Sequence, residues 1–176
     1  MRVLVILNND FEDLEANGSI IIFRRAGYDV TVIGDTPSIT SKYTTYTGLK
    51  TFDDIDFKDF DLLFLPGGGY IPSTKTNEAI KYFMEHNLNI VSICSAPTYL
   101  GHLGYLKNRK YVCFPSMNED FGGTFVDDYV VVDGNIFTGR SVSAAMKLPL
   151  KVVETLSGKD ALKKLKRQMT FLEKDI

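Results

Sequence analysis

Cys94 stands where a reactive thiol is most favoured, directly after an apolar run and just before a predicted helix. Residues 89–94 predict a buried strand, and Pro97 suits the first turn of the next helix. A cysteine near a helix N-terminus is favoured as thiolate, which attacks electrophiles and oxidises to sulfenic or sulfinic acid. The same strand–turn–helix geometry forms a nucleophile elbow. The spacing alone equally allows a small buried hydrophobe at this position.

The second cysteine and the two histidines fit structural roles better than catalytic ones. Cys113 lies in the apolar run Tyr-Val-Cys-Phe and is expected in the core. His86 and His102 fall on predicted helices, pointing away from Cys94, so no catalytic triad is expected. The sequence has two cysteines and no Cys-x-x-Cys pair, so we expect neither a disulfide framework nor a metal site.

A glycine run, Gly67 to Gly69, follows another apolar run and Pro66. Because the carboxyl ends of parallel strands meet at one sheet edge, this loop is expected beside Cys94. Its backbone N–H groups suit an anion or oxyanion site, although a plain tight turn explains the glycines equally well. The loop lacks the Lys-Ser/Thr of a phosphate-binding loop, so it does not indicate a nucleotide.

Three carboxylates, Glu12, Asp13 and Glu15, open the first predicted helix. Acidic residues in a first turn ordinarily compensate the helix dipole, and this is the simplest explanation for them. Glu15 is the one that can point across the sheet edge at the thiol, where a carboxyl would share its proton with sulfur.

The elements that must position these residues follow an alternating pattern of short apolar runs and helical stretches. This pattern predicts an α/β fold with a mostly parallel sheet covered on both faces. Strands are predicted at 2–7, 29–34, 61–65, 89–94 and 111–114, with a hairpin at 130–132 and 136–138 and helices at 13–26, 77–85, 141–156 and 159–172. A polar stretch near residues 44–51 suggests an edge hairpin.

Size and charge limit the function classes. The 176 residues fit one domain, 1–176, and a formal net charge of −2 gives no footprint for nucleic acid. The lysine-rich segment 159–167 is read as the solvated face of a helix. The sequence has no apolar run of roughly 18 residues and no signal-peptide pattern at its start, so we expect a cytoplasmic protein that does not enter a membrane.

Five motifs in order resemble the ThiJ/PfpI superfamily, and most closely its DJ-one branch. They are Phe-Glu-Asp-Leu-Glu-Ala around Glu15, Arg-Arg-Ala-Gly ending at Gly27, Leu-Pro-Gly-Gly ending at Gly68, Ile-Cys-Ser-Ala-Pro around Cys94, and Val-Asp-Gly-Asn-Ile-Phe-Thr ending at Thr138. The resemblance spans nearly the whole chain, from residue 2 to about residue 158.

The resemblance implies a flavodoxin-like three-layer α/β/α sandwich of the class I glutamine-amidotransferase type, and a homodimer formed through the first helix around Gly18. It also implies that Cys94 is the elbow nucleophile and that Glu15 hydrogen-bonds its sulfur. Gly68 and Ser95 would supply backbone donors for an oxyanion. Gly67, Phe114 and Arg140 would then form the pocket, with no cofactor.

Two departures from the family concern this pocket. The sequence has Phe114 where some members carry a histidine, and Ser141-Val142-Ser143 where members commonly carry a Gly-Pro-Gly turn. The second change is expected to reshape the wall beside Cys94. Proteolysis is disfavoured because the protease branch has a histidine directly after the cysteine, and here that residue is Ser95.

The resemblance leaves several functions open. One is an enzyme of carbonyl stress that acts on small α-oxoaldehydes, as a glyoxalase or deglycase. Another is a redox sensor or chaperone-like dimer in which Cys94 reacts with an oxidant. A hydrolase of the amidotransferase or peptidase type is less favoured because neither histidine is expected near the thiol. A domain that only binds a small carboxylate at the glycine loop is a further, equally less favoured alternative.

Overall fold

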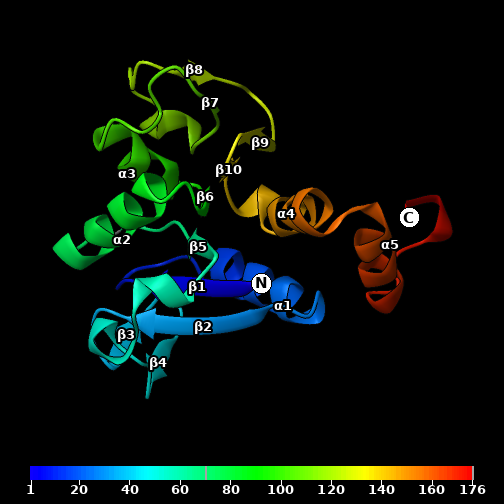
Figure 1. Cartoon of the computed structure of the whole chain (residues 1–176), viewed down its shortest axis with the longest axis horizontal. Coiled ribbons are helices and arrows are strands. Elements are labelled where there is room, and N and C mark those ends of the chain that lie inside the picture. The colour runs from blue at the N-terminus through cyan, green and yellow to red at the C-terminus, as the bar shows by residue number, and fades with distance from the viewer. Residues whose placement is uncertain (70, 176) are drawn as a thin grey trace.

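A six-stranded sheet forms the centre of the computed structural model, which describes residues 1–69 and 71–175 (Figure 1). The strand order is β2-β1-β5-β6-β10-β9, parallel except for β9, which runs antiparallel to β10. The central strands are apolar and buried on both faces, as parallel sheets require. The strands are β1 Arg2–Leu7, β2 Asp29–Gly34, β5 Leu62–Leu65, β6 Asn89–Ile93, β9 Val130–Asp133 and β10 Ile136–Gly139.

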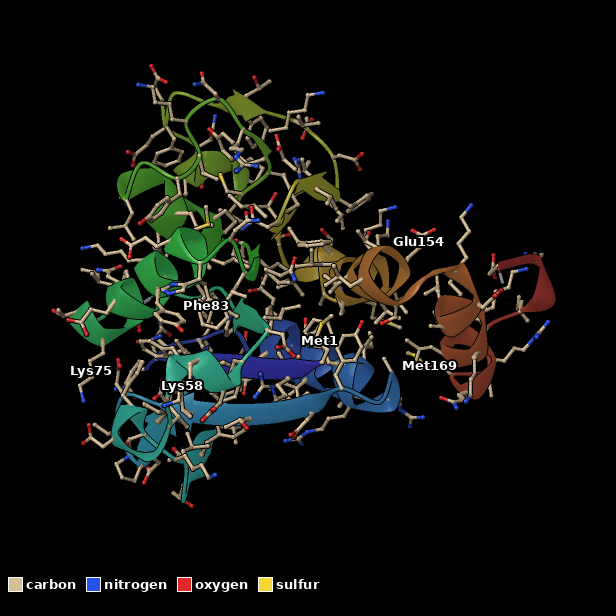
Figure 2. The ribbon with its side chains drawn as sticks, viewed as in Figure 1. Met1, Lys58, Lys75, Phe83, Glu154 and Met169 are labelled. Atoms are coloured by element: carbon tan, nitrogen blue, oxygen red, sulfur yellow. The ribbon has the colours of Figure 1, made fainter. Side chains whose placement is uncertain are left out.

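Helices cover both faces of this sheet and make it the middle layer of a sandwich. One core, on the side of α1 and α4, holds Phe23 of α1 together with Phe64 and Phe137 of the sheet, and α5 adds Leu165 to it. The other core, on the side of α2 and α3, holds Phe83 of α2. In Figure 2 the Phe83 side chain lies inside, whereas Lys75 projects outward from the same helix. The helices are α1 Asp13–Arg25, α2 Thr74–Glu85, α3 Ala96–His102, α4 Lys147–Ser157 and α5 Lys159–Gln168. The predicted flavodoxin-like α/β/α sandwich is therefore confirmed.

Smaller elements lie at the sheet edges. A hairpin of β3 Ser38–Thr40 and β4 Thr45–Thr47 follows β2, and β7 Lys110–Tyr111 pairs with β8 Thr124–Phe125. Short 3-10 helices occur at Phe52–Asp54, Phe57–Asp59, Pro115–Met117, Val142–Ala144 and Glu173–Asp175. Within the described residues, every helix is too short or too polar to span a lipid bilayer.

Four predicted elements differ in extent by more than one residue. The helix predicted at 77–85 begins at Thr74, and the helix predicted at 159–172 ends at Gln168. The strand at 111–114 is only two residues long, because the N–H of Val112 donates to Thr138 Oγ1 and that of Phe114 to the carbonyl of Cys94. The helix at 141–156 begins at Lys147 instead. A helix starting at residue 141 would place Pro149 in its interior, where proline removes a hydrogen bond and clashes with the preceding turn.

Candidate functional site

Cys94 occupies the sharp turn between β6 and α3. Its backbone adopts φ of 64°, a left-handed conformation that costs a non-glycine residue on the order of 1 kcal/mol or more. Neighbouring segments hold it there, since its N–H donates to Gly139 O at 2.9 Å and its carbonyl accepts from Phe114 N at 2.7 Å. The predicted strand–turn–helix placement is thus correct, and the thiol lies at the carboxyl edge of the sheet, partly exposed.

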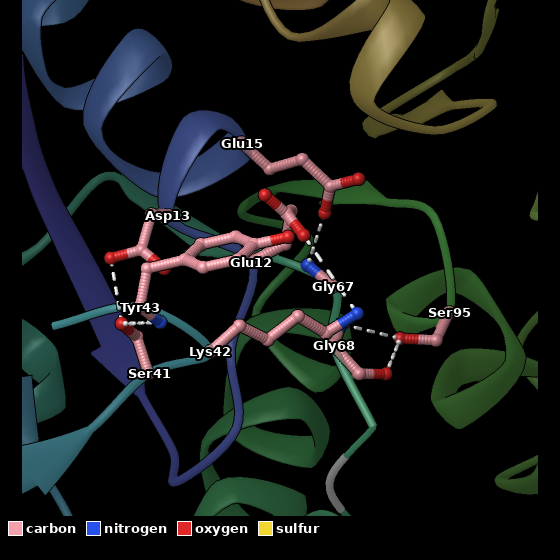
Figure 3. A network of polar contacts seen from close by, with 9 residues as sticks. All are labelled: Glu12, Asp13, Glu15, Ser41, Lys42, Tyr43, Gly67, Gly68 and Ser95. Atoms are coloured by element: carbon pink, nitrogen blue, oxygen red, sulfur yellow. Dashed lines mark hydrogen bonds and ion pairs between the residues drawn. The ribbon is translucent and has the colours of Figure 1, made fainter.

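Glu15 enters the same place from the first turn of α1. Its side chain is fully buried, and Oε2 accepts a hydrogen bond from Gly67 N at 2.9 Å (Figure 3). A Cβ on Gly67 would lie 2.5 Å from Cys94 Cβ and 2.7 Å from Glu15 Oε2. Glycine at this position therefore lets the carboxyl approach the thiol, and it lies behind the pair rather than on the pocket wall.

Burial dominates the protonation of both groups. It raises the pKa of Glu15 to about 7, against which the hydrogen bonds with Cys94 and Gly67 act more weakly. Burial also raises the pKa of the Cys94 thiol to about 12, and the negative charge of Glu15 adds to the effect. This direction is opposite to the thiolate stabilisation expected from the helix start, because desolvation and the neighbouring carboxylate outweigh the Ser95 N–H. The pair therefore gives up its first proton from Glu15, near neutral pH.

The glycine loop does not present free N–H groups to a ligand as expected. Gly68 N donates to Ser95 Oγ at 3.0 Å, and the same hydroxyl donates back to Gly68 O at 2.9 Å. Gly69 N donates to Asp10 O at 3.1 Å, while the N–H of Gly67 is bound by Glu15. In this structure a serine hydroxyl therefore occupies the Gly68 donor, and donation from Gly68 to an oxyanion stays a prediction. Of the two predicted backbone donors, the Ser95 N–H is the one directed at sulfur.

The two other carboxylates of the first turn have partners of their own. Glu12 is the N-cap residue of α1, yet its side chain makes no capping hydrogen bond and forms an ion pair with Lys42 at 3.8 Å. Asp13 accepts from Ser41 Oγ at 2.6 Å and from Tyr46 OH at 3.2 Å, which ties the β3–β4 hairpin to the helix (Figure 3). Dipole compensation alone does not explain this cluster.

A pocket of about 400 Å³ opens above the thiol. Two charged residues, Glu12 and Lys42, form part of its wall, and three apolar residues, Phe114, Met117 and Val142, form another part. The lining residues are Glu12, Glu15, Lys42, Gly68, Gly69, Cys94, Ser95, Phe114, Met117, Ser141 and Val142. Of the loop at residues 141–143, Ser141 and Val142 line this wall, whereas Ser143 does not.

Arg140 was predicted in this pocket and lies elsewhere. Its guanidinium forms an ion pair with Asp127 and lines a separate hollow with Tyr129 and Ser143. The alternation of backbone direction beyond β10 sends residue 140 to that side and Ser141 to the pocket. Sequence reasoning also missed Lys42, which reaches the pocket only because the hairpin folds back onto α1.

The other candidates from the sequence lie away from the pocket. Cys113 is fully buried, as expected. His86 stacks on Tyr82, and His102 pairs with Glu119 at 3.3 Å, so neither histidine lines the pocket. Within residues 1–69 and 71–175, no group of three His, Cys, Asp or Glu side chains is arranged to hold a metal ion.

The topology of the sheet and the turn at Cys94 together define a class of protein, the α/β sandwich proteins with a cysteine on a strand-to-helix turn. The family model of the DJ-1/PfpI family matches residues 1–155. The chain therefore belongs to the DJ-1/PfpI family, which confirms the resemblance inferred from its motifs.

Individual relatives agree with this assignment. The chain is 34% identical over 151 residues to Deglycase PH1704 of Pyrococcus horikoshii, covering 80% of this chain and 90% of that protein. It is also 34% identical over 150 residues to Deglycase TK1284 of Thermococcus kodakarensis, with the same coverage of both proteins. Among solved structures, Drosophila melanogaster DJ-1beta superposes with a TM-score of 0.86 at 28% identity, covering 97% of this chain and 98% of that one.

Proposed function

We propose that this protein is an enzyme of carbonyl stress in which Cys94 captures small α-oxoaldehydes, free or released from adducts with amines. The observation that carries the proposal is the buried Glu15 carboxyl beside the elbow thiol, with its pKa raised to about 7. A general acid–base group works best when its pKa lies near the operating pH. Two relatives at 34% identity are named deglycases, which supports the same class of chemistry.

The first step joins sulfur to the aldehyde. As Cys94 Sγ attacks the carbonyl carbon, the thiol proton passes to the Glu15 carboxylate, whose Oε1 has no hydrogen-bond partner among the described residues. The C=O electron pair becomes an alkoxide, which takes this proton back from Glu15 to give a hemithioacetal and leaves Glu15 as a carboxylate. In this scheme the high pKa of the thiol is no obstacle, because the base removes the proton during attack.

The second step moves a proton between neighbouring carbons. Glu15 takes the proton from the former aldehyde carbon and returns one to the adjacent carbon, which leaves a thioester of a 2-hydroxy acid on Cys94. Water then cleaves the thioester and restores the thiol. Methylglyoxal plus water gives lactate and a proton, so the balance needs only water as co-reactant.

Lactate formation from methylglyoxal tests the proposal. Wild type and Cys113→Ser are expected to form lactate at equal rates, because Cys113 is buried away from the pocket. Cys94→Ser and Glu15→Gln are expected to lose at least about a hundredfold in kcat/KM, the scale of a nucleophile or acid–base group. Equal rates in wild type and Cys94→Ser would refute the enzymatic proposal.

Oxidation sensing by Cys94 is a second candidate, favoured by a difference between the two cysteines. Cys94 opens to the pocket and Cys113 is fully buried, so peroxide is expected to reach only the first. Two equivalents of peroxide would convert the thiol to a sulfinic acid and release two waters. Intact-mass analysis should then show two added oxygens in wild type and none in Cys94→Ser, and oxidation confined to Cys113 would contradict the sensor.

A homodimer through α1 completes the proposal. Leu14 and Ile21 are about half exposed on one face of this helix. Met146 is exposed to a similar degree, and it follows Ala145, the residue that α1 contacts at Gly18. Gly18 lies on the same face but already packs against Ala145 of its own chain. The exposed apolar side chains, rather than Gly18, are therefore the residues that favour a partner.

A further inference from the structure

The proposed attack on a carbonyl creates negative charge on oxygen, and the glycine loop is poorly prepared to receive it. The three N–H groups of Gly67, Gly68 and Gly69 donate to Glu15, Ser95 and Asp10. Beside the Ser95 N–H, which is directed at the sulfur, an alkoxide formed at Cys94 would therefore gain from a further donor, since electrostatic stabilisation of this oxygen is usually the largest catalytic contribution in acyl-type chemistry.

Of the described residues that line the pocket, only Lys42 carries a positive charge. Its ammonium pairs with Glu12 at 3.8 Å, which is longer than a hydrogen bond, so its N–H donors stay open to a ligand. The side chain remains 41% exposed and extends past the glycine loop toward Glu12 (Figure 3). Lys42 therefore faces the volume in which a substrate would sit.

The hairpin loop that carries Lys42 is held in place by several bonds. Ser41 Oγ donates to Asp13 Oδ1 and accepts from the N–H groups of Tyr43 and Thr44. The N–H of Lys42 donates to Phe11 O at 3.2 Å. These contacts fasten the loop to the start of α1, so the ammonium is presented by a preorganised turn and not by a free loop tip.

We propose that Lys42 is the oxygen-binding and specificity-determining residue of this pocket. Its ammonium would donate to the carbonyl oxygens of an α-oxoaldehyde and hold the alkoxide after attack by Cys94, while Phe114, Met117 and Val142 accept the apolar substituent. This inference rests on the proposed function. It assigns the site to aldehydes that carry a second oxygen next to the reacting carbon, including anionic ones such as glyoxylate.

The influence of Lys42 on the reacting groups supports this assignment. The positive charge of Lys42 acts to lower the pKa of both Glu15 and Cys94, although burial prevails at each. The ammonium is thus close enough for its charge to be felt at the thiol and at the carboxyl. A negative charge that forms between them would feel it as well.

Alkylation of Cys94 by a charged and a neutral reagent tests the charge directly. The ratio of the iodoacetate rate to the iodoacetamide rate is expected to fall about three- to tenfold in Lys42→Met, because an attractive charge near the thiol is lost. It should stay within about twofold in Lys42→Arg and in Lys58→Met, a control for an exposed lysine outside the pocket. An unchanged ratio in Lys42→Met would overturn the inference.

Turnover separates this inference from the proposed function. With methylglyoxal, Lys42→Met is expected to lose about tenfold or more in kcat/KM, with Lys42→Arg retaining most of it. If the ratio of alkylation rates falls but turnover in Lys42→Met equals wild type, the oxygen-binding role is wrong. If wild type forms no lactate at all, the proposed function fails, and the alkylation ratio still decides whether Lys42 attracts anions to the thiol.

Discussion

At the scale of single residues, the three carboxylates at positions 12, 13 and 15 differ in partner and therefore in function. Glu12 faces Lys42, Asp13 anchors the β3–β4 hairpin, and Glu15 is buried against Cys94. Helical spacing explains the division, since successive side chains in the first turn point about 100° apart. Glu15 is fully buried, and burial raises its pKa to about 7.

The raised pKa of Glu15 has a consequence for stability. Its carboxyl titrates at about 7 in the folded chain, against 4.5 ordinarily, so the folded state holds this proton more tightly than the unfolded state. This stabilisation is complete below about pH 4.5 and is lost as the pH rises through 7, by up to about 3 kcal/mol.

Urea unfolding of Glu15→Gln at pH 5 and pH 8 measures that contribution. The variant is expected to lose less stability between the two pH values than wild type, by about 1 to 3 kcal/mol, because glutamine does not ionise. Glu154→Gln, a change at a carboxylate on α4 that pairs with Lys151 outside the pocket, should keep the wild-type difference. An identical pH dependence in wild type and Glu15→Gln would contradict the burial argument.

At the scale of elements, the contact of the β5 loop with the elbow decides whether the site can form. Gly67→Ala would bring a Cβ to 2.5 Å from Cys94 Cβ and 2.8 Å from Ile93 O, both closer than van der Waals contact allows. We expect a loss of about 1 to 3 kcal/mol in the free energy of unfolding and a large loss of turnover, because Glu15 or the elbow must move.

Gly18→Ala in α1 is the matched control for that substitution. There an added Cβ would lie 3.6 Å from Ala145 O, an ordinary contact, and alanine is favoured over glycine in a helix. Its unfolding free energy should be unchanged or higher by up to about 1 kcal/mol. Thermal unfolding of both variants checks the pair, and a Gly67→Ala protein as stable as Gly18→Ala would refute the packing argument.

Much of this arrangement could be predicted from the sequence, for a specific physical reason. Parallel strands are buried on both faces, so they read as apolar runs, and their carboxyl ends meet at one edge. That rule brings Glu15, Gly67 and Cys94 together without any knowledge of side-chain contacts. The family resemblance then added their expected roles.

The remaining features depend on contacts that have no local signal. Lys42 reaches the pocket through the bonds of Ser41 to Asp13, across 28 positions of sequence. Arg140 lies outside it because its guanidinium pairs with Asp127 in a separate hollow. The occupied N–H of Gly68 follows from the rotamer of Ser95, which sequence spacing does not reveal.

At the scale of the whole molecule, the proposed dimer predicts a defined response to charge. Ile21→Glu places a carboxylate on the exposed apolar face of α1, where Ile21 is 52% exposed, and should convert a dimer to monomers. Ile71→Glu changes an even more exposed isoleucine, at 90%, that lies outside α1, and should leave the dimer intact. Light scattering distinguishes them, and a monomeric wild type would refute the proposal.

The proposed mechanism depends most on a Glu15 carboxyl that titrates near neutral pH beside the Cys94 thiol. NMR of protein labelled with carboxyl-13C glutamate follows this group directly, and the spectrum of Glu15→Gln identifies its signal. The proposed mechanism predicts that the chemical shift of the Glu15 carboxyl titrates with a midpoint at about pH 7. A midpoint near the ordinary 4.5 would contradict it, because the carboxyl would then be too weak a base at neutral pH to take the proton of Cys94.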